Sequence, residues 1–317
     1  MNSSGTDRKL AWILPAAVSV VVVGGMLIVP YASGYSLRSD PLWRLLLMLW
    51  NSEEWKHGML VFPIAVVLLF LKRKELTKVP TKGSNWGLLL IVPSLFVYWV
   101  GFVANVQYMG YLAIQLMLAG CVIWFFGVRF FKAVFFIWCF LFFAYPFIFL
   151  EDLVAFPLRL LMSEASVWFL NLIGFHSIRD GTSILSAADP VVGIVKGQRY
   201  SVDVSDPCSG IRSLFALTMI SALLGILSFR TGWKVMLLFV AALPLTVFGN
   251  FCRILMLTFG TIAFGSDFAV GTLTNPTWFH LAAGFVVYIA ALIGIILFAR
   301  LLNGQFGTKL QQVNKNS

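Results

Sequence analysis

Long apolar runs without a charged side chain dominate this sequence, and most are long enough to cross a lipid bilayer. The first extends from Leu10 to about Ala32, directly after Arg8 and Lys9. A membrane-spanning helix needs about 20 apolar residues, more than the apolar segment of a cleavable signal peptide. Only 11% of the residues are charged, against about 25% in a soluble domain. We therefore expect a membrane protein that retains this first span.

The apolar runs predict an all-α fold, a polytopic transmembrane helical bundle of about eight spans. The expected spans are 10–33, 55–71, 86–104, 107–127, 131–149, 207–229, 234–261 and 278–302. Two further segments, the apolar 41–50 and the mixed 151–174, are expected to lie at the membrane surface. We expect a single transmembrane domain over residues 1–303 and a polar cytoplasmic tail over 304–317.

The longest polar loop, residues 175–206, is expected to contain a small hairpin on the outer face. Residues 193–195 and 200–204 are rich in β-branched side chains, and Lys196-Gly197-Gln198 between them is typical of a turn. This hairpin and the surface helix 151–174 are expected to form a wall or lid over a site on that face.

Basic residues are divided unequally between alternate loops. With a cytoplasmic N-terminus, 14 of the 23 Lys and Arg residues fall in inner segments with only two acids, and the outer segments hold the remaining nine with eleven acids. Cytoplasmic loops of membrane proteins are enriched in Lys and Arg. The net charge of +10 therefore indicates membrane orientation rather than nucleic-acid binding. Both termini are expected in the cytoplasm.

A cysteine stands where the long outer loop meets the sixth apolar run. Asp206 is a suitable helix N-cap and Pro207 a suitable first helical residue. Cys208 then lies in the first turn, where unpaired backbone N–H groups and the helix dipole favour the thiolate. Arg212, four residues later, projects from the same helix face. The alternative is a buried structural cysteine, which is common in membrane proteins.

Two polar side chains interrupt the last two spans. Nineteen residues separate Lys234 from Arg253, a rise of about 28 Å along a helix, which places Arg253 near the outer edge of the hydrocarbon. Asn250 lies on roughly the same face. His280 is expected in the first turn of the last span, capped by Thr277. Arg253 could instead extend to the lipid headgroups, and His280 could be an ordinary interfacial residue.

The predicted topology places Cys208, Arg253 and His280 at one depth, near the outer surface. A thiol, an imidazole and a guanidinium are the parts of a cysteine acyl-transfer site. The imidazole would take the thiol proton, and the guanidinium would stabilise the developing oxyanion. His57, at the outer start of the second span, could bind substrate, shape the cavity or simply lie at the interface. No pair among the four cysteines has metal-ligand spacing, so we expect no metal and no cofactor.

Other functions remain open on these residues alone. A transporter or channel would use Arg253 and His280 to line a pathway, but its spans should contain more polar side chains. A lipid-linked acyl or glycosyl transferase would need a base at the same depth, for which Asp203, Asp206 and Asp267 are candidates. If the protein were a structural scaffold, the shared depth of Cys208, Arg253 and His280 would be a coincidence.

Around these residues the sequence resembles the exosortase/archaeosortase family of polytopic membrane proteins. The resemblance lies in Cys208-Ser209-Gly210-Ile211-Arg212-Ser213-Leu214, in Asn250 with Arg253, in His280 with Gly284, and in His57-Gly58. It covers roughly residues 50–300.

The resemblance implies a cysteine protease or transpeptidase with Cys208, Arg253 and His280 as its triad. It implies supporting or substrate-binding roles for the residues of the matching motifs: Ser209, Gly210, Arg212, Asn250 and His57. The implied partners are the lipid bilayer, an acceptor nucleophile, and secreted proteins that end in a short motif of Pro-Glu-Pro type, a transmembrane helix and a basic tail. The implied location is the outer face of a bacterial cytoplasmic membrane, in a setting of exopolysaccharide production.

Overall fold

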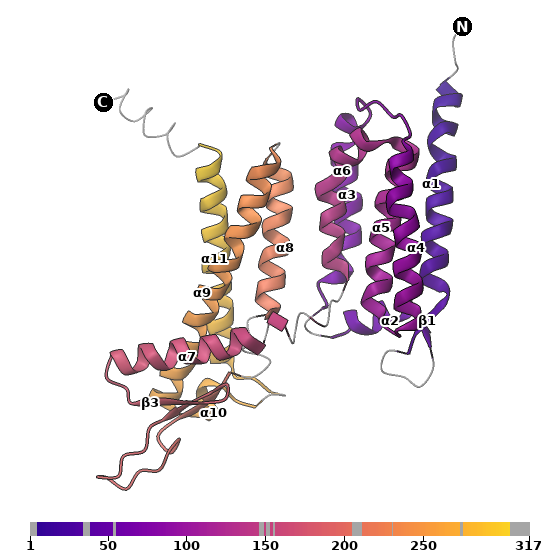
Figure 1. The fold of residues 1–317 in the computed structure, drawn as a ribbon. Helices are drawn as coiled ribbons and strands as arrows, with labels where there is room; N and C mark the ends of the chain where they lie inside the picture. The colour runs from indigo at the N-terminus through magenta and orange to yellow at the C-terminus, as the bar shows by residue number, and fades with distance from the viewer. Residues whose placement is uncertain are drawn as a thin grey trace, which may run out of the picture. The chain divides into compact units, whose positions relative to one another are not determined.

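The computed structural model (Figure 1) describes residues 5–33, 39–52, 55–145, 149, 153–154, 156–204, 211–229, 231–272 and 275–304, without the side chains of 5–16, 211 and 212. The chain forms two compact units, Met1–Phe147 and Ile148–Ser317. The expected single domain over 1–303 and the tail over 304–317 stay a prediction.

The first unit is a bundle of helices. Its elements are α1 (Gly5–Ile28), β1 (Pro30–Ala32), β2 (Asp40–Pro41), α2 (Leu42–Trp50), α3 (Gly58–Leu76), the 3-10 turn η1 (Asn85–Gly87), α4 (Leu88–Val103), α5 (Gln107–Phe126), α6 (Val128–Phe140) and the 3-10 turn η2 (Leu141–Ala144). A short connection lets α4 and α5 pack side by side (Figure 1). The segment 41–50, expected at the membrane surface, forms α2 and buries one face within the unit.

Tyrosines form much of the interior of this unit. Tyr31 and Tyr111 are fully buried, and the Tyr111 ring stacks on Tyr145 with ring centroids 5.2 Å apart. The Tyr31 hydroxyl donates to the Tyr98 carbonyl at 2.8 Å. Gly101 makes room for that hydroxyl, because a Cβ there would overlap it. The buried Tyr31 hydroxyl is thus paired with a backbone group.

The second unit combines three long helices with a crossing helix and a small sheet. Its elements are α7 (Phe156–Leu172), β3 (Ser177–Asp180), β4 (Ser183–Ser186), β5 (Ser201–Asp203), α8 (Ile211–Ser228), α9 (Gly232–Phe264), α10 (Ser266–Ala269) and α11 (Trp278–Leu302). In Figure 1, α8, α9 and α11 run side by side, and α7 lies across one end of them, next to the sheet. The segment 151–174, expected as a surface helix, contains α7.

The sheet corrects the expected hairpin. The three strands are antiparallel in the order β3-β4-β5, so residues 200–204 contribute the strand β5 but pair with β4, not with 193–195. Ile194 forms only an isolated bridge to Asp189. The tight turn is Gly181-Thr182 between β3 and β4, where Gly181 has a φ of 59°. Glycine at the first position of a two-residue loop favours this hairpin, since it adopts positive φ without strain.

Four helical segments in the described residues are long and apolar enough to cross a membrane: Asn85–Val103, Gln107–Phe126, Gly232–Phe264 and Trp278–Leu302. Together with two shorter apolar helices, Ala17–Ile28 and Ser213–Ser228, they confirm an all-α polytopic membrane protein. α3 ends in Lys72, Arg73, Lys74 and Glu75, and α6 has only 13 residues. The count of eight spans and the location of the termini stay predictions.

Candidate active site

Helix α9 carries Asn250 and Arg253 at fixed distances along its axis from Lys234. It has 33 residues, about 50 Å of helix, and no charged side chain between Lys234 and Arg253. The Lys234 ammonium donates to the Leu302 carbonyl at 2.8 Å, which ties the start of α9 to the end of α11. The two helices are therefore antiparallel, and the far part of α9 lies beside the beginning of α11.

Arg253 packs against the backbone of α11 at Gly284. A Cβ placed on Gly284 would lie 3.3 Å from both Cζ and Nε of Arg253 and 3.4 Å from its Nη2. Contacts of this length are tighter than ordinary van der Waals contact, so a side chain at position 284 would displace the guanidinium. Gly284 belongs to the motif that it forms with His280 in the sequence, and the structure shows that its packing partner is Arg253.

His280 lies one turn before Gly284 on α11. The residue is buried, with 4% exposed, one helical turn from the glycine against which Arg253 packs. The ring nitrogen Nδ1 lies 3.2 Å from the Val270 carbonyl. A carbonyl can only accept, so Nδ1 carries the proton, and Nε2 is the nitrogen that can take a second one. The contact holds the imidazole in the tautomer of a general base.

Thr277 holds the Val270 carbonyl in place. Its hydroxyl accepts from the His280 N–H at 3.1 Å, which confirms the expected helix cap, and also donates to the Ala269 carbonyl at 3.2 Å. Its backbone N–H donates to the Val270 carbonyl at 3.4 Å. At Gly271, φ is 76° and a Cβ would lie 2.7 Å from the Asn275 carbonyl oxygen. The loop that orients His280 thus depends on local contacts that the sequence analysis did not identify.

A small cavity lies between α8, α9 and α11 beside Arg253. Its volume is about 20 Å³, room for one water molecule, and its lining includes Ser213, Thr246, Asn250 and Tyr288. Asn250 is 4% exposed, and neither its Oδ1 nor its Nδ2 has a hydrogen-bond partner in the protein as far as the structure describes it. Leaving a buried amide unpaired costs about 1–3 kcal/mol. Polar groups kept inside membrane helices at such a cost usually serve function.

Some of the expected site residues lie outside the described part of the chain, and others are brought together. Cys208, Ser209 and Gly210 lie outside the described residues, and Arg212 is the second residue of α8, with a side chain that the structure does not describe. Asn250, Arg253, Gly284 and His280 are brought together in the second unit.

His57 belongs to the first unit, where it directly precedes α3. A Cβ on the next residue, Gly58, would overlap the Trp50 indole, whose Nε1 donates to the Ala144 carbonyl at 2.8 Å. The glycine of the His57-Gly58 pair therefore has a packing role.

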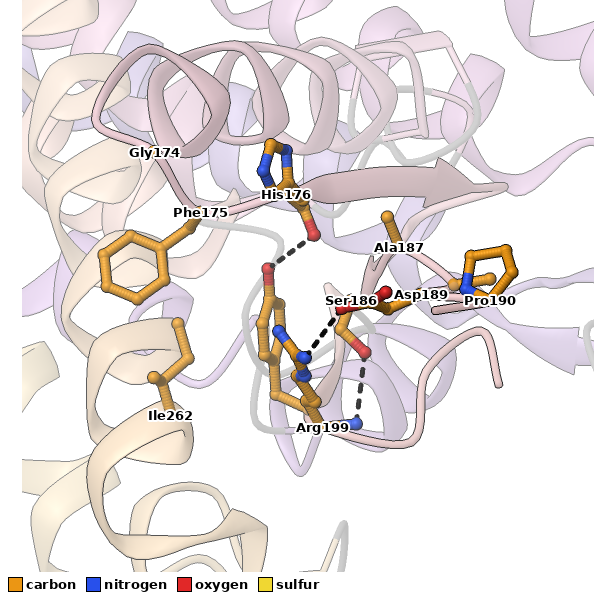
Figure 2. Close-up of a pocket in the computed structure, with 11 residues that line it drawn as sticks. Gly174, Phe175, His176, Ser186, Ala187, Asp189, Pro190, Arg199 and Ile262 are labelled. Atoms are coloured by element: carbon orange, nitrogen blue, oxygen red, sulfur yellow. Dashed lines mark hydrogen bonds and ion pairs between the residues drawn. The ribbon is translucent and has the colours of Figure 1, made fainter. Parts of the chain in front are cut away.

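A second, larger pocket opens beside the sheet (Figure 2). Its volume is about 700 Å³, and its walls come from residues 174–176, 186–190, 199–200 and Ile262. The Tyr200 hydroxyl lies 2.7 Å from the Ser177 hydroxyl, and the Arg199 guanidinium pairs with Asp189 at 3.1 Å. Because its cation is already paired with a carboxylate, this pocket carries no uncompensated charge. None of the expected site residues lines it.

The sequence was compared with known proteins. The family model described as transmembrane exosortase matches residues 49–297, a stretch that contains every expected site residue. No curated protein and no solved structure matches the chain.

Proposed function

Because the chain belongs to the transmembrane exosortase family, and is therefore a membrane sorting enzyme, we propose that Cys208, Arg253 and His280 form its catalytic centre. The observation that carries this proposal is the arrangement of Arg253 against Gly284, one helical turn from His280. A guanidinium and an oriented imidazole beside each other supply two of the three parts of a cysteine acyl-transfer site.

The reaction begins with proton transfer. His280 Nε2 takes the thiol proton of Cys208 while its Nδ1–H remains bonded to the Val270 carbonyl. The thiolate attacks the scissile carbonyl, and the guanidinium of Arg253 donates to the oxyanion that develops. The C–N bond then breaks, the protonated imidazole gives its proton to the leaving amine, and a thioester remains on Cys208. An acceptor nucleophile, or water, resolves the thioester after losing its own proton to His280.

Asn250 supports this centre from α9, three residues before Arg253. Its amide faces the small cavity that Arg253 also lines, so one bridging water can connect the two side chains. Arg212 acts near the cysteine and contributes less than Arg253. Ser209 and Gly210, which follow Cys208 in the sequence, have supporting or substrate-binding roles in this proposal.

The substrates are secreted proteins whose C-terminal sorting signal has a short motif, a transmembrane helix and a basic tail. The helix would insert beside α8, α9 and α11 with its basic tail on the cytoplasmic side. Its motif, of Pro-Glu-Pro type in bacteria, would then emerge at the depth of Arg253 on the outer face. The product is transferred to a surface acceptor in a cell that produces exopolysaccharide.

The transferase alternative receives less support from the carboxylates. Asp203 accepts hydrogen bonds from the Thr182 and Ser183 hydroxyls at 3.1 and 3.2 Å on an exposed strand. Asp267 lies in the first turn of the short helix α10. Neither residue belongs to the cavity beside Arg253, and the third candidate, Asp206, lies outside the described residues.

Replacement of Cys208 tests the proposal. A reporter with a Pro-Glu-Pro segment, an apolar helix and a basic tail is coexpressed with the enzyme, and its cleavage is followed on immunoblots. Cys208→Ala should lower cleavage by about a thousandfold or more at normal enzyme abundance, because the nucleophile is lost. Cys252→Ala, next to Arg253 in the sequence, should retain cleavage. Normal cleavage by the Cys208→Ala variant would refute the mechanism.

A further inference from the structure

The sheet of the second unit has two edges, and they differ. The strand order is β3-β4-β5, so β3 and β5 are the edge strands. An edge strand presents unpaired backbone N–H and C=O groups to any extended chain that approaches it. An additional strand can bind at an edge whose outward backbone groups do not already have hydrogen-bond partners.

The edge at β3 is closed by a side chain of α7. The Asn171 amide donates to the Ser177 carbonyl at 3.0 Å and accepts from the Ser177 N–H at 2.7 Å. One side chain thus provides the donor and the acceptor that a neighbouring strand would provide. Ser177 is a residue whose backbone points outward, since the ladder bonds of this pair are made at Ile178 and Asp180.

The edge at β5 is open. Tyr200 accepts from the Ser186 N–H at 3.0 Å, which identifies residues 186 and 200 as a hydrogen-bonded pair. Pairing alternates along antiparallel strands, so Val202 bonds to β4 while the backbone groups of Ser201 and Asp203 point away from it. Both of these residues are exposed, and within the described chain no backbone partner takes their outward groups.

The position of β5 links this edge to the catalytic centre. Tyr200 and Val204, at its two ends, pack in one apolar cluster with Leu257 of α9 and Ala283 of α11, the neighbour of Gly284. In the sequence, Cys208 follows Asp203 by five residues, so their Cα atoms are at most about 18 Å apart. The open edge is thus tied to the helices that carry Arg253 and His280, and to the segment that carries the thiol.

We propose that the outward edge of β5 binds the extended segment of the substrate that precedes its transmembrane helix, as an added β-strand. The inference rests on the proposed function. Backbone pairing at Ser201 and Asp203 supplies affinity that is independent of the substrate side chains. The bound segment is an extended chain rather than a helix. The outward backbone groups belong to every second residue of β5, and only an extended chain presents its own backbone groups with the same repeat.

Proline at position 201 tests the edge without breaking the sheet. Ser201→Pro removes an outward N–H and leaves the ladder bonds between β4 and β5 in place, and proline is tolerated on edge strands. This variant should raise the KM for the reporter about tenfold and leave kcat nearly unchanged. The KM rises because one hydrogen bond to the substrate is lost and the proline ring blocks its approach. The matched control Ser201→Ala keeps the N–H and should stay within about twofold of the parent enzyme.

Cysteine cross-linking gives a second, independent readout. Ser201→Cys is combined with Cys208→Ala, which leaves the reporter intact, and single cysteines are placed along the reporter segment before its helix. Cross-links should form at alternate reporter positions and be absent when Ser201 is retained. Equal KM values for the proline and alanine variants, or cross-links without this alternation, would overturn the proposal. Retained cleavage by the Cys208→Ala variant is a different result, because it removes the proposed function itself.

Discussion

At the scale of single residues, the contact between Arg253 and Gly284 decides how the cation is held. A guanidinium within a membrane bundle must be oriented by packing and hydrogen bonds, because no bulk water surrounds it. Gly284 supplies a surface of bare helix backbone, and the nearest atoms of Arg253 lie 3.3 Å from the place of an added Cβ. Any side chain at position 284 therefore moves the guanidinium.

Substitution of Gly284 measures this requirement. Gly284→Ala should lower kcat several-fold, since Arg253 must shift by a few tenths of an ångström, and Gly284→Leu should abolish cleavage at normal abundance. Gly294→Ala is the matched control, because an added Cβ there meets Leu245 at an ordinary 3.5 Å. Reporter cleavage with purified enzyme gives the rates. Equal losses at positions 284 and 294 would mean that helix packing, not the guanidinium, limits the rate.

The sequence predicted Arg253 and His280 at one depth, with Asn250 on the helix face of Arg253, because helix rise and loop charge place them there. Gly284 was singled out by the family resemblance, in the motif that it forms with His280. It did not predict the Val270 carbonyl as the partner of His280. That contact is made by a backbone atom in an irregular loop, and a backbone carbonyl leaves no residue signature. Tyr288 and Thr246 were also missed, since single hydroxyls in a span carry little signal until the cavity between the helices is known.

At the scale of elements, a part-buried contact joins the start of α9 to the end of α11. The last carbonyls of a helix lack partners within it, and a cation there satisfies one of them and complements the helix dipole. Lys234 does this for Leu302 at 2.8 Å, and its ammonium also lies 5.8 Å from the ring centroids of Phe229 and Trp233. This side chain thus joins the start of α9 to the end of α11.

Loss of the Lys234 charge should loosen this pair. Lys234→Met keeps the length of the side chain but leaves the Leu302 carbonyl without its donor, which should cost about 1 kcal/mol. Thermal unfolding in detergent should show a Tm lower by a few degrees, and Lys234→Arg should retain most of the stability. Lys132→Met removes an equal charge from an exposed lysine for which the structure gives no hydrogen bond, and it should leave the Tm unchanged. Equal Tm values for both methionine variants would contradict the capping role.

The helices were predicted better than the strands. Apolar length and flanking charge locate α4, α5, α9 and α11, because a bilayer imposes that length directly. The strand partner of β5 was predicted wrongly. The dipeptide Asp180-Gly181 marked the true turn, but the nearby Gly197 gave a competing turn signal, and periodicity alone does not choose between them.

At the scale of the whole molecule, the distribution of Lys and Arg predicts the membrane orientation, which the geometry within either unit does not give. The basic segment Lys72–Lys82, which includes the end of α3, is expected inside the cell. The sheet with its loop at Val191, 95% exposed, is expected outside it. Both positions are exposed in their own units, so both suit chemical labelling.

Labelling of intact cells checks this orientation. In a cysteine-free chain, Val191→Cys should react with a membrane-impermeant maleimide in intact cells, and Lys78→Cys should react only after the cells are permeabilised. The charged reagent reaches the outer face alone, so the two labels report the two sides. Labelling of Lys78→Cys in intact cells would invert the topology and move the proposed site to the cytoplasmic face.

The length of α9 has a consequence for which bond is cut. From Lys234 to Arg253 the helix rises by about 28 Å, a distance fixed because an α-helix resists stretching. Under the proposed function, a substrate helix anchored by its basic tail at the level of Lys234 would present to Arg253 whichever peptide bond lies at that height. One added helical turn in the substrate would lift its motif by about 5.4 Å, past the guanidinium. The proposed site would then select the bond by its distance from the anchored tail as well as by the residues that flank it.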